Sequence, residues 1–189
     1  MRIILASKSK RRQELLERIG LEFEVIVSTK DEVEDPNLSP LENCQNISYQ
    51  KALDVLEKTD GDRIIISCDT IVVKDNKIYG KPKDKEDAYN VLKLLSGTTH
   101  EVISCLTVIK VKDMKEEVYK TYGTGIVYID LMTDNEIYDW IENGNPYDKA
   151  GGYAIQEGFG KYVSKIEGDY SSIIGIPLNK LYNILKKII

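Results

Sequence analysis

The stretch that decides the fold class runs Arg63-Ile64-Ile65-Ile66-Ser67-Cys68-Asp69-Thr70-Ile71-Val72-Val73. Apolar runs of this length are typical of buried strands. We expect a strand over Arg63–Ser67, its exit at Cys68-Asp69-Thr70, and a resumed apolar run over Ile71–Val73. Asp69 then follows the carboxyl end of a strand, which is where open α/β sheets bind their ligands.

Strands and helices alternate along the rest of the chain. The apolar patterns predict strands over Arg2–Ala6, Phe23–Val27, His100–Val111 and Val118–Ile129. They predict helices over Arg11–Ile19, from Ser39 to about Lys58, from Asp84 to Leu95, from Thr133 to about Gly144, and over Leu178–Ile188. Two of these helices begin with a capping box, and Gly151–Gly160 is expected to form a loop. This order indicates an α/β fold with a mixed sheet flanked by helices.

Composition narrows the class of protein. A chain of 189 residues, with 42% hydrophobic and 30% charged residues, suits a single globular domain or one domain with two lobes. A net charge of −5 argues against a protein that coats nucleic acid. The sequence has neither the apolar core of a signal peptide nor a run of about 18 apolar residues that could span a membrane. The three cysteines form no Cys-x-x-Cys pair, so we expect reduced thiols and a cytoplasmic protein.

The histidine content limits the metal chemistry. His100 is the only histidine, which excludes a zinc site built from two or three histidines. A catalytic metal would be held mainly by oxygen ligands, and such ligands favour Mg²⁺ or Mn²⁺.

The segment Ser7-Lys8-Ser9-Lys10-Arg11-Arg12 is the first candidate site. It places cations in the first turn of a helix, where they oppose the helix dipole. A bound anion reverses that cost, because backbone amides and arginines both face it. A solvated basic turn capped by Ser9 is the alternative.

Four further features are ambiguous when taken singly. Asp69 can hold a metal or accept a proton from water, but an Asp-Thr turn is as common. Gly80-Lys81-Pro82 can bring a lysine close to a ligand or form a surface turn. Lys51 and Glu32 are each compatible with an ordinary solvated position. Gln156, at the end of Ala150–Gln156, can read a base edge through one donor and one acceptor, although a structural glycine loop explains the same pattern.

Taken together, these segments resemble the Maf family of nucleotide pyrophosphatases in order and spacing along nearly the whole chain. The matching segments are Leu5–Arg12, Lys51-Ala52, Cys68–Val73, Gly80-Lys81-Pro82, Leu95-Ser96-Gly97 with His100, Asp148–Tyr153, Gly168-Asp169-Tyr170 and Gly175–Leu178.

The resemblance implies a fold and a reaction. Members of the family are two-lobed α/β proteins with a deep cleft, related in fold to the inosine triphosphate pyrophosphatases. They hydrolyse the bond between the α and β phosphates with a divalent cation, and a homodimer is expected. Ser7, Arg11, Arg12, Lys51 and Lys81 would bind the triphosphate. Glu32 and Asp69 would handle metal and water, with Asp69 as general base.

The resemblance also indicates a substrate class. Arg11, Thr70 and Gln156 resemble the subgroup that acts on dTTP, UTP and some modified pyrimidine nucleotides. The sister subgroup, associated with 7-methyl-GTP and CTP, has Trp and Gln in place of Arg11 and Thr70. This chain departs from the usual family pattern at three places. Lys10 stands where Pro is usual, and Cys68 stands where Ala or Ser is usual. Gln156 is followed by Glu157-Gly158, where Gly usually follows directly.

Three other functions compete with this interpretation. The family has been linked with septum formation, so a nucleotide-binding regulator of cell division with little turnover is one alternative. A phosphatase or nucleotidyl transferase is the second. A Cys- or Ser-dependent hydrolase is the third, and it would keep its rate after mutation of Asp69.

Overall fold

The computed structural model describes residues 1–189 and divides into two compact units. The first unit contains residues 1–69, 104–123 and 175–189, and the second contains residues 70–103 and 124–174. None of the helices combines the length and apolarity needed to cross a membrane.

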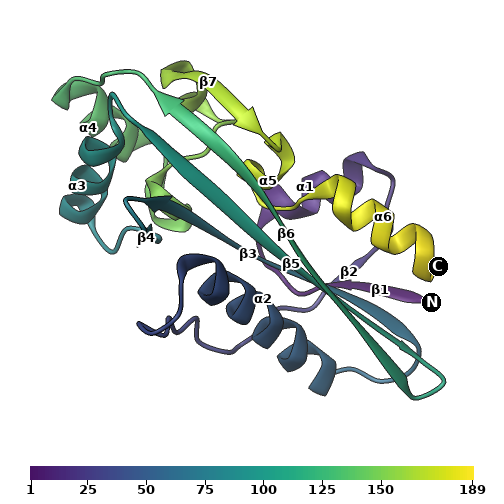
Figure 1. Cartoon of the computed structure of the whole chain (residues 1–189). Coiled ribbons are helices and arrows are strands. Elements are labelled where there is room, and N and C mark those ends of the chain that lie inside the picture. Colours follow the sequence, from purple (N-terminus) through teal and green to yellow (C-terminus); the bar gives the residue numbers. More distant parts are fainter. The chain divides into compact units, whose positions relative to one another are not determined.

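Seven strands form one mixed sheet (Figure 1). The strands are β1 (Arg2–Leu5), β2 (Glu24–Val25), β3 (Arg63–Lys74), β4 (Lys77–Tyr79), β5 (Thr99–Lys112), β6 (Lys115–Ile129) and β7 (Val163–Gly168). Their order is β2-β1-β3-β5-β6-β7, and β4 pairs with β3. The helices are α1 (Lys10–Arg18), α2 (Pro40–Glu57), α3 (Lys85–Leu95), α4 (Asp134–Asn143), α5 (Tyr170–Ile174) and α6 (Leu178–Ile188). The α/β fold predicted from the sequence is confirmed.

The first unit is built on the parallel pairing of β1 with β2 and β3, in which Ile4 lies opposite Ile65. Residues Ala52 and Val55 of α2 pack with Ile4 and Ile65 in one apolar cluster. Figure 1 shows α1 and α6 on the other side of these strands from α2. Helices therefore cover both faces of the strands, which is why the consecutive residues Ile64, Ile65 and Ile66 of β3 are all fully buried.

The second unit has a separate apolar core. It includes Leu92 and Leu95 of α3, Ile137 and Trp140 of α4, and Phe159. Helices α3 and α4 lie side by side (Figure 1). The unit also contains a tight hairpin between β3 and β4, whose turn residues Asp75 and Asn76 both have positive φ. A two-residue turn of this kind matches the twist of the flanking strands.

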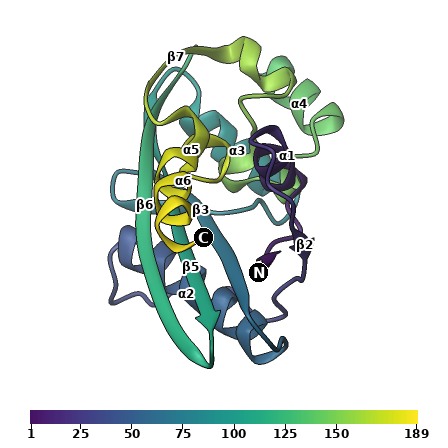
Figure 2. The same ribbon diagram turned by 90° about the vertical axis from the view of Figure 1, so that its right-hand side faces the viewer.

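Most expected elements are present, but several bounds differ. The strand expected over Phe23–Val27 is only Glu24–Val25, and the loop expected over Gly151–Gly160 is partly formed by the 3-10 helices Ala150–Gly152 and Gly158–Tyr162. Ser39 and Thr133 each begin a helix with a complete capping box, as predicted. The long hairpin between β5 and β6 turns at Asp113-Met114. Figure 2 shows β5 and β6 running side by side as long strands. The predicted exit at Cys68–Thr70, however, is the middle of the continuous strand β3. Asp69 is only 5% exposed, so this buried strand carries an acidic side chain in its middle.

The buried His100 makes the stability of the second unit depend on pH. Its side chain contacts the hydroxyl of Tyr153 through Nε2, and its buried Nδ1 has no hydrogen-bond partner. Burial, with a smaller contribution from the charge of Lys74, lowers the pKa of His100 to about 4. An unfolded chain binds this proton near pH 6.5, so stability is present above that pH and is lost as the pH falls toward 4.

We therefore expect the free energy of unfolding to decrease by up to about 3 kcal/mol as the pH is lowered from 6.5 to 4. Chemical denaturation across that range measures it, with His100→Gln as the comparison. Because the chain has no other histidine, the unfolding free energy of the variant should change much less with pH over this range. Equal slopes in the two proteins would contradict this prediction.

Candidate functional site

The basic turn of the first unit begins helix α1. Its first turn carries Lys10, Arg11 and Arg12 and no acidic residue. Ser9 occupies the N-cap position, but its side chain makes no capping hydrogen bond. The side-chain cap expected from Ser9 is therefore absent, whereas the choice between a phosphate site and a solvated basic turn stays a prediction. Positive side chains and the positive end of the helix dipole lie together, which is the arrangement that binds an anion.

Arg12 is held in place by two contacts within the first unit. Its Nη1 donates to Ser7 Oγ at 3.1 Å, and its Nε donates to the carbonyl of Gly175 at 3.0 Å. Ser7 Oγ also accepts from the backbone N–H of Ser9 at 3.3 Å. A guanidinium fixed through two nitrogens loses little further freedom when it binds an anion.

Lys51 joins the two acidic candidates. Its Nζ lies 2.8 Å from Glu32 Oε1 and 2.8 Å from Asp69 Oδ1. The three residues come from a loop, from helix α2 and from strand β3, and they meet at one point. The Lys51 side chain is only 11% exposed, so the predicted alternative of a solvated helix lysine is wrong.

The neighbours of Asp69 fix the strand that carries it. Cys44 Sγ donates to the carbonyl of Asp69 at 3.4 Å, and Ser48 Oγ donates to the carbonyl of Ser67 at 3.2 Å. Both donors lie on α2, which also carries Lys51. One helix therefore positions the strand backbone and the cation that faces its carboxylate.

The cysteine beside Asp69 is a poor nucleophile. Cys68 is fully buried, and this burial raises the pKa of its thiol to about 12. Since the thiolate is the reactive form, Cys68 is chemically inert at neutral pH. Cys68 therefore packs as a small buried residue, as the Ala or Ser usual in the family at this position would.

The acidic pair suits a cation that is shared with a ligand. No group of three or more His, Cys, Asp or Glu side chains is placed to hold a metal ion. Glu32 and Asp69 nevertheless direct two carboxylates to one point. Mg²⁺ is commonly held by one or two carboxylates together with waters and substrate phosphates. The two carboxylates therefore suit a cation that also binds water and substrate phosphates. They are too few for a cation that is held by protein ligands alone.

The second unit carries the other predicted site residues, Thr70, Lys81 and Gln156. Thr70 is half-buried in β3, and Lys81 is exposed in the turn that follows β4. The carbonyl of Gly80 accepts from the N–H of Gly151 at 2.9 Å, which ties the Lys81 turn to the Gly-rich loop. Gly151 has a φ of 65°, and a Cβ at this position would lie 2.8 Å from Val72 Cγ2. Only glycine therefore permits this approach.

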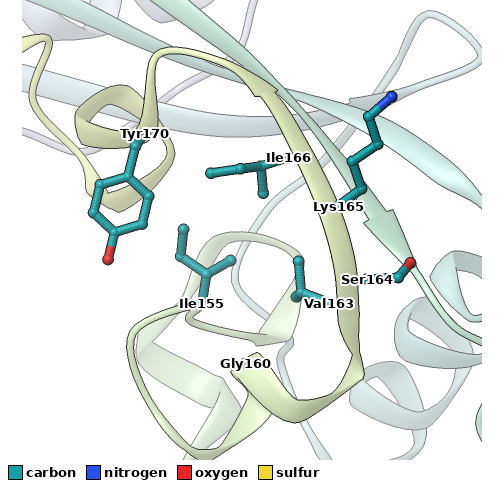
Figure 3. Close-up of a pocket in the computed structure, with 7 residues that line it drawn as sticks. All are labelled: Ile155, Gly160, Val163, Ser164, Lys165, Ile166 and Tyr170. Carbon is teal, nitrogen blue, oxygen red and sulfur yellow. The ribbon is translucent and has the colours of Figure 1, made fainter.

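Gln156 lies in a turn beside an apolar hollow. The hollow has a volume of about 300 Å³. Its lining residues are Ile155, Gly160, Val163, Ser164, Lys165, Ile166 and Tyr170. Figure 3 shows Ile155, Val163, Ile166 and Tyr170 around the hollow, while the side chains of Ser164 and Lys165 point away from it.

A bulge in β7 explains why the hollow is apolar. Tyr128 of β6 pairs with Lys165, but the next residue, Ile129, pairs with Val163, so Ser164 is an extra residue. Such an insertion breaks the alternation of a strand and changes the direction of its side chains. Val163 and Ile166 consequently share one side.

Two contributors to the site were not identified from the sequence. The carbonyl of Gly175 positions Arg12, and the buried Lys149 contacts Asn145, which precedes the Gly-rich loop, and Glu157, which lies within it. Both residues belong to segments that carried the family resemblance, but neither pattern reveals a contact with a distant residue. Contacts between residues that are far apart in the sequence depend on tertiary packing.

Comparison with known proteins gives matches along the whole chain. Residues 2–188 match the family described as Maf-like protein. A protein of Clostridium botulinum (strain Alaska E43 / Type E3), named dTTP/UTP pyrophosphatase, is 47% identical over 100% of both chains. A protein of the same name from Thermoanaerobacter sp. (strain X514) is 43% identical over 99% of this chain and 96% of the relative. Among solved structures, a HAM1 protein from Coxiella burnetii is 15% identical over 99% of both chains, with a TM-score of 0.49.

Proposed function

Since the chain belongs to the Maf-like protein family, we propose that it hydrolyses nucleoside triphosphates, preferably dTTP and UTP, to the nucleoside monophosphate and pyrophosphate. The names of the relatives support the substrate class. One structural observation carries the reaction: Lys51 brings two carboxylates to one point beside the middle of the buried strand β3. A protein that only bound nucleotide would gain little from carboxylates facing phosphates.

The basic residues would bind the phosphates of the substrate. Ser7, Arg11 and Arg12 would receive the triphosphate at the start of α1. The family resemblance gives Lys81 a role in neutralising phosphate charge. Phosphoryl chemistry depends chiefly on such positioning and charge neutralisation. The contacts that hold Arg12 support this role, because a fixed cation stabilises developing negative charge without reorganisation.

Asp69 would act as general base. A water molecule attacks the α phosphorus, Asp69 accepts the proton of that water, and the bond from the α phosphorus to the bridging oxygen breaks. Pyrophosphate leaves with the bonding electron pair. Lys51 would hold the Asp69 and Glu32 carboxylates in place and offset their charges as the anionic substrate arrives.

Glu32 and Asp69 would also hold a divalent cation, Mg²⁺ or Mn²⁺, together with substrate phosphates. When bound, such an ion offsets phosphate charge and lowers the pKa of water. Lys51 would then retain a neighbouring position, since a lysine ammonium has three donors on a flexible stem.

Gln156 would read the base, and Arg11 and Thr70 would contribute to the choice of dTTP and UTP, including modified pyrimidines. The amide of Gln156 offers one acceptor and two donors, which matches the N3–H and O4 of uracil or thymine. The apolar hollow beside Ile155 supports this placement, because a pyrimidine ring needs an apolar neighbour as well as polar contacts.

The remaining features are inferred from the family. We infer a single functional domain that comprises both units, which the continuous match over residues 2–188 supports. We also infer a homodimer and a cytoplasmic location. None of the three cysteines, Cys44, Cys68 and Cys105, forms a disulfide, which suits a reducing compartment. Light scattering of the purified protein tests the dimer.

Product analysis tests the function directly. Purified protein with Mg²⁺ or Mn²⁺ is incubated with dTTP, UTP, CTP, GTP and 7-methyl-GTP. We expect monophosphate and pyrophosphate in equal amounts, formed fastest from dTTP and UTP. Orthophosphate as the first product would indicate a phosphatase. Nucleotide binding without turnover would indicate a regulator.

A further inference from the structure

Lys149 is a buried lysine that the proposed reaction does not use. Its side chain is 4% exposed. Its Nζ donates to the carbonyl of Asn145 at 2.9 Å and to Asp148 Oδ1 at 2.8 Å, and it lies 3.3 Å from Glu157 Oε2. A lysine is rarely buried unless its charge is paired, and here three oxygens surround it.

These contacts close the loop that contains Gln156. Lys149 Nζ contacts Asn145, which precedes Gln156 by eleven positions, and Glu157, which follows it, so it bridges the segment 145–157. The Lys149 backbone adds two bonds, from its N–H to the carbonyl of Pro146 at 3.2 Å and from the N–H of Gly152 to its carbonyl at 3.0 Å. Glu157 directly follows Gln156, so this ion pair restrains the backbone on which the glutamine sits.

In the proposed function, the orientation of the Gln156 amide decides which pyrimidine it accepts. Uracil presents an N–H donor at N3 and an acceptor at O4, whereas cytosine presents an acceptor at N3 and a donor at N4. A glutamine amide that rotates by half a turn exchanges its own donor and acceptor, and so matches either base. Discrimination between UTP and CTP therefore requires a loop that holds the amide in one orientation.

We propose that Lys149 is a positioning residue for base selection, which acts by clamping Glu157 and thereby fixing Gln156. This inference rests on the proposed function. The effect should appear mainly in KM, because the base lies away from the reacting phosphorus.

The test compares steady-state kinetics on UTP and CTP for the wild type, Lys149→Met and Glu157→Gln. Methionine retains an unbranched chain and removes the charge, while glutamine at position 157 retains shape and leaves Lys149 paired with Asp148. We expect the UTP-to-CTP ratio of kcat/KM to fall about tenfold in Lys149→Met, and by a smaller factor in Glu157→Gln, with kcat for UTP changed less than about threefold.

Lys93→Met is the matched control, because Lys93 pairs with Asp134 in an exposed ion pair of the same unit. It should leave the ratio unchanged. A folded Lys149→Met with the wild-type ratio overturns the inference, and if that variant does not fold, an unchanged ratio in Glu157→Gln overturns it instead. A wild-type protein that turns over neither nucleotide instead rejects the proposed function itself.

Discussion

Asp69→Asn should lower kcat for dTTP and UTP by about a hundred- to ten-thousand-fold, which is the usual contribution of a positioned general base. Asparagine has almost the same shape as aspartate, but it cannot accept the proton of the attacking water. The variant should remain folded, since Lys51 retains Glu32 as its ionic partner at 2.8 Å. Steady-state kinetics and thermal unfolding of the same preparation measure both properties.

Asp54→Asn is the matched control for this variant. Asp54 is also a buried carboxylate of the first unit that is paired with a lysine, at 2.6 Å from Lys58 Nζ. The hydrogen bond from Lys58 lowers the pKa of Asp54 to about 2. Its replacement should therefore reduce stability above pH 4 and leave kcat nearly unchanged. Near-normal turnover in Asp69→Asn would reject Asp69 as the base.

Lys51→Met should lower kcat by about a hundredfold or more, because it removes the cation that joins the two carboxylates. Glu32 and Asp69 would then repel each other and would face an anionic substrate without compensation. The substitution keeps an unbranched side chain, so helix α2 should still form. Rates with dTTP at saturating Mg²⁺ measure the effect.

The same helix supplies the control. Lys58 is also paired with an aspartate, but its contacts are with Asp54 and Thr29. Lys58→Met should retain most of the wild-type kcat. If both lysine variants lose activity equally, the loss reflects damage to the helix, and Lys51 has no special role.

The missing elements show where local patterns are weak. Strand β7 was not predicted, because the extra residue Ser164 disrupts its alternation and its flanks are polar. Strand β4 and helix α5 have only three and five residues, which is too short for a periodic signal. The end of the strand was predicted too early, after Ser67, because a charged residue in an apolar run usually marks the end of a strand. Here the strand continues through Asp69, whose charge is paired with the buried Lys51.

The sequence by itself determined the α/β class, the helix starts at Ser39 and Thr133, and the motifs that identify the family. These features depend on residues within one or two turns of each other, and short-range geometry is encoded directly in the pattern. Only the tertiary structure decided that Glu32, Lys51 and Asp69 converge, and that Lys149 is buried. A lysine on a helix or in a loop has the same local pattern whether water or a carboxylate surrounds its amine. The surroundings are set by the packing of distant segments, which no local pattern contains.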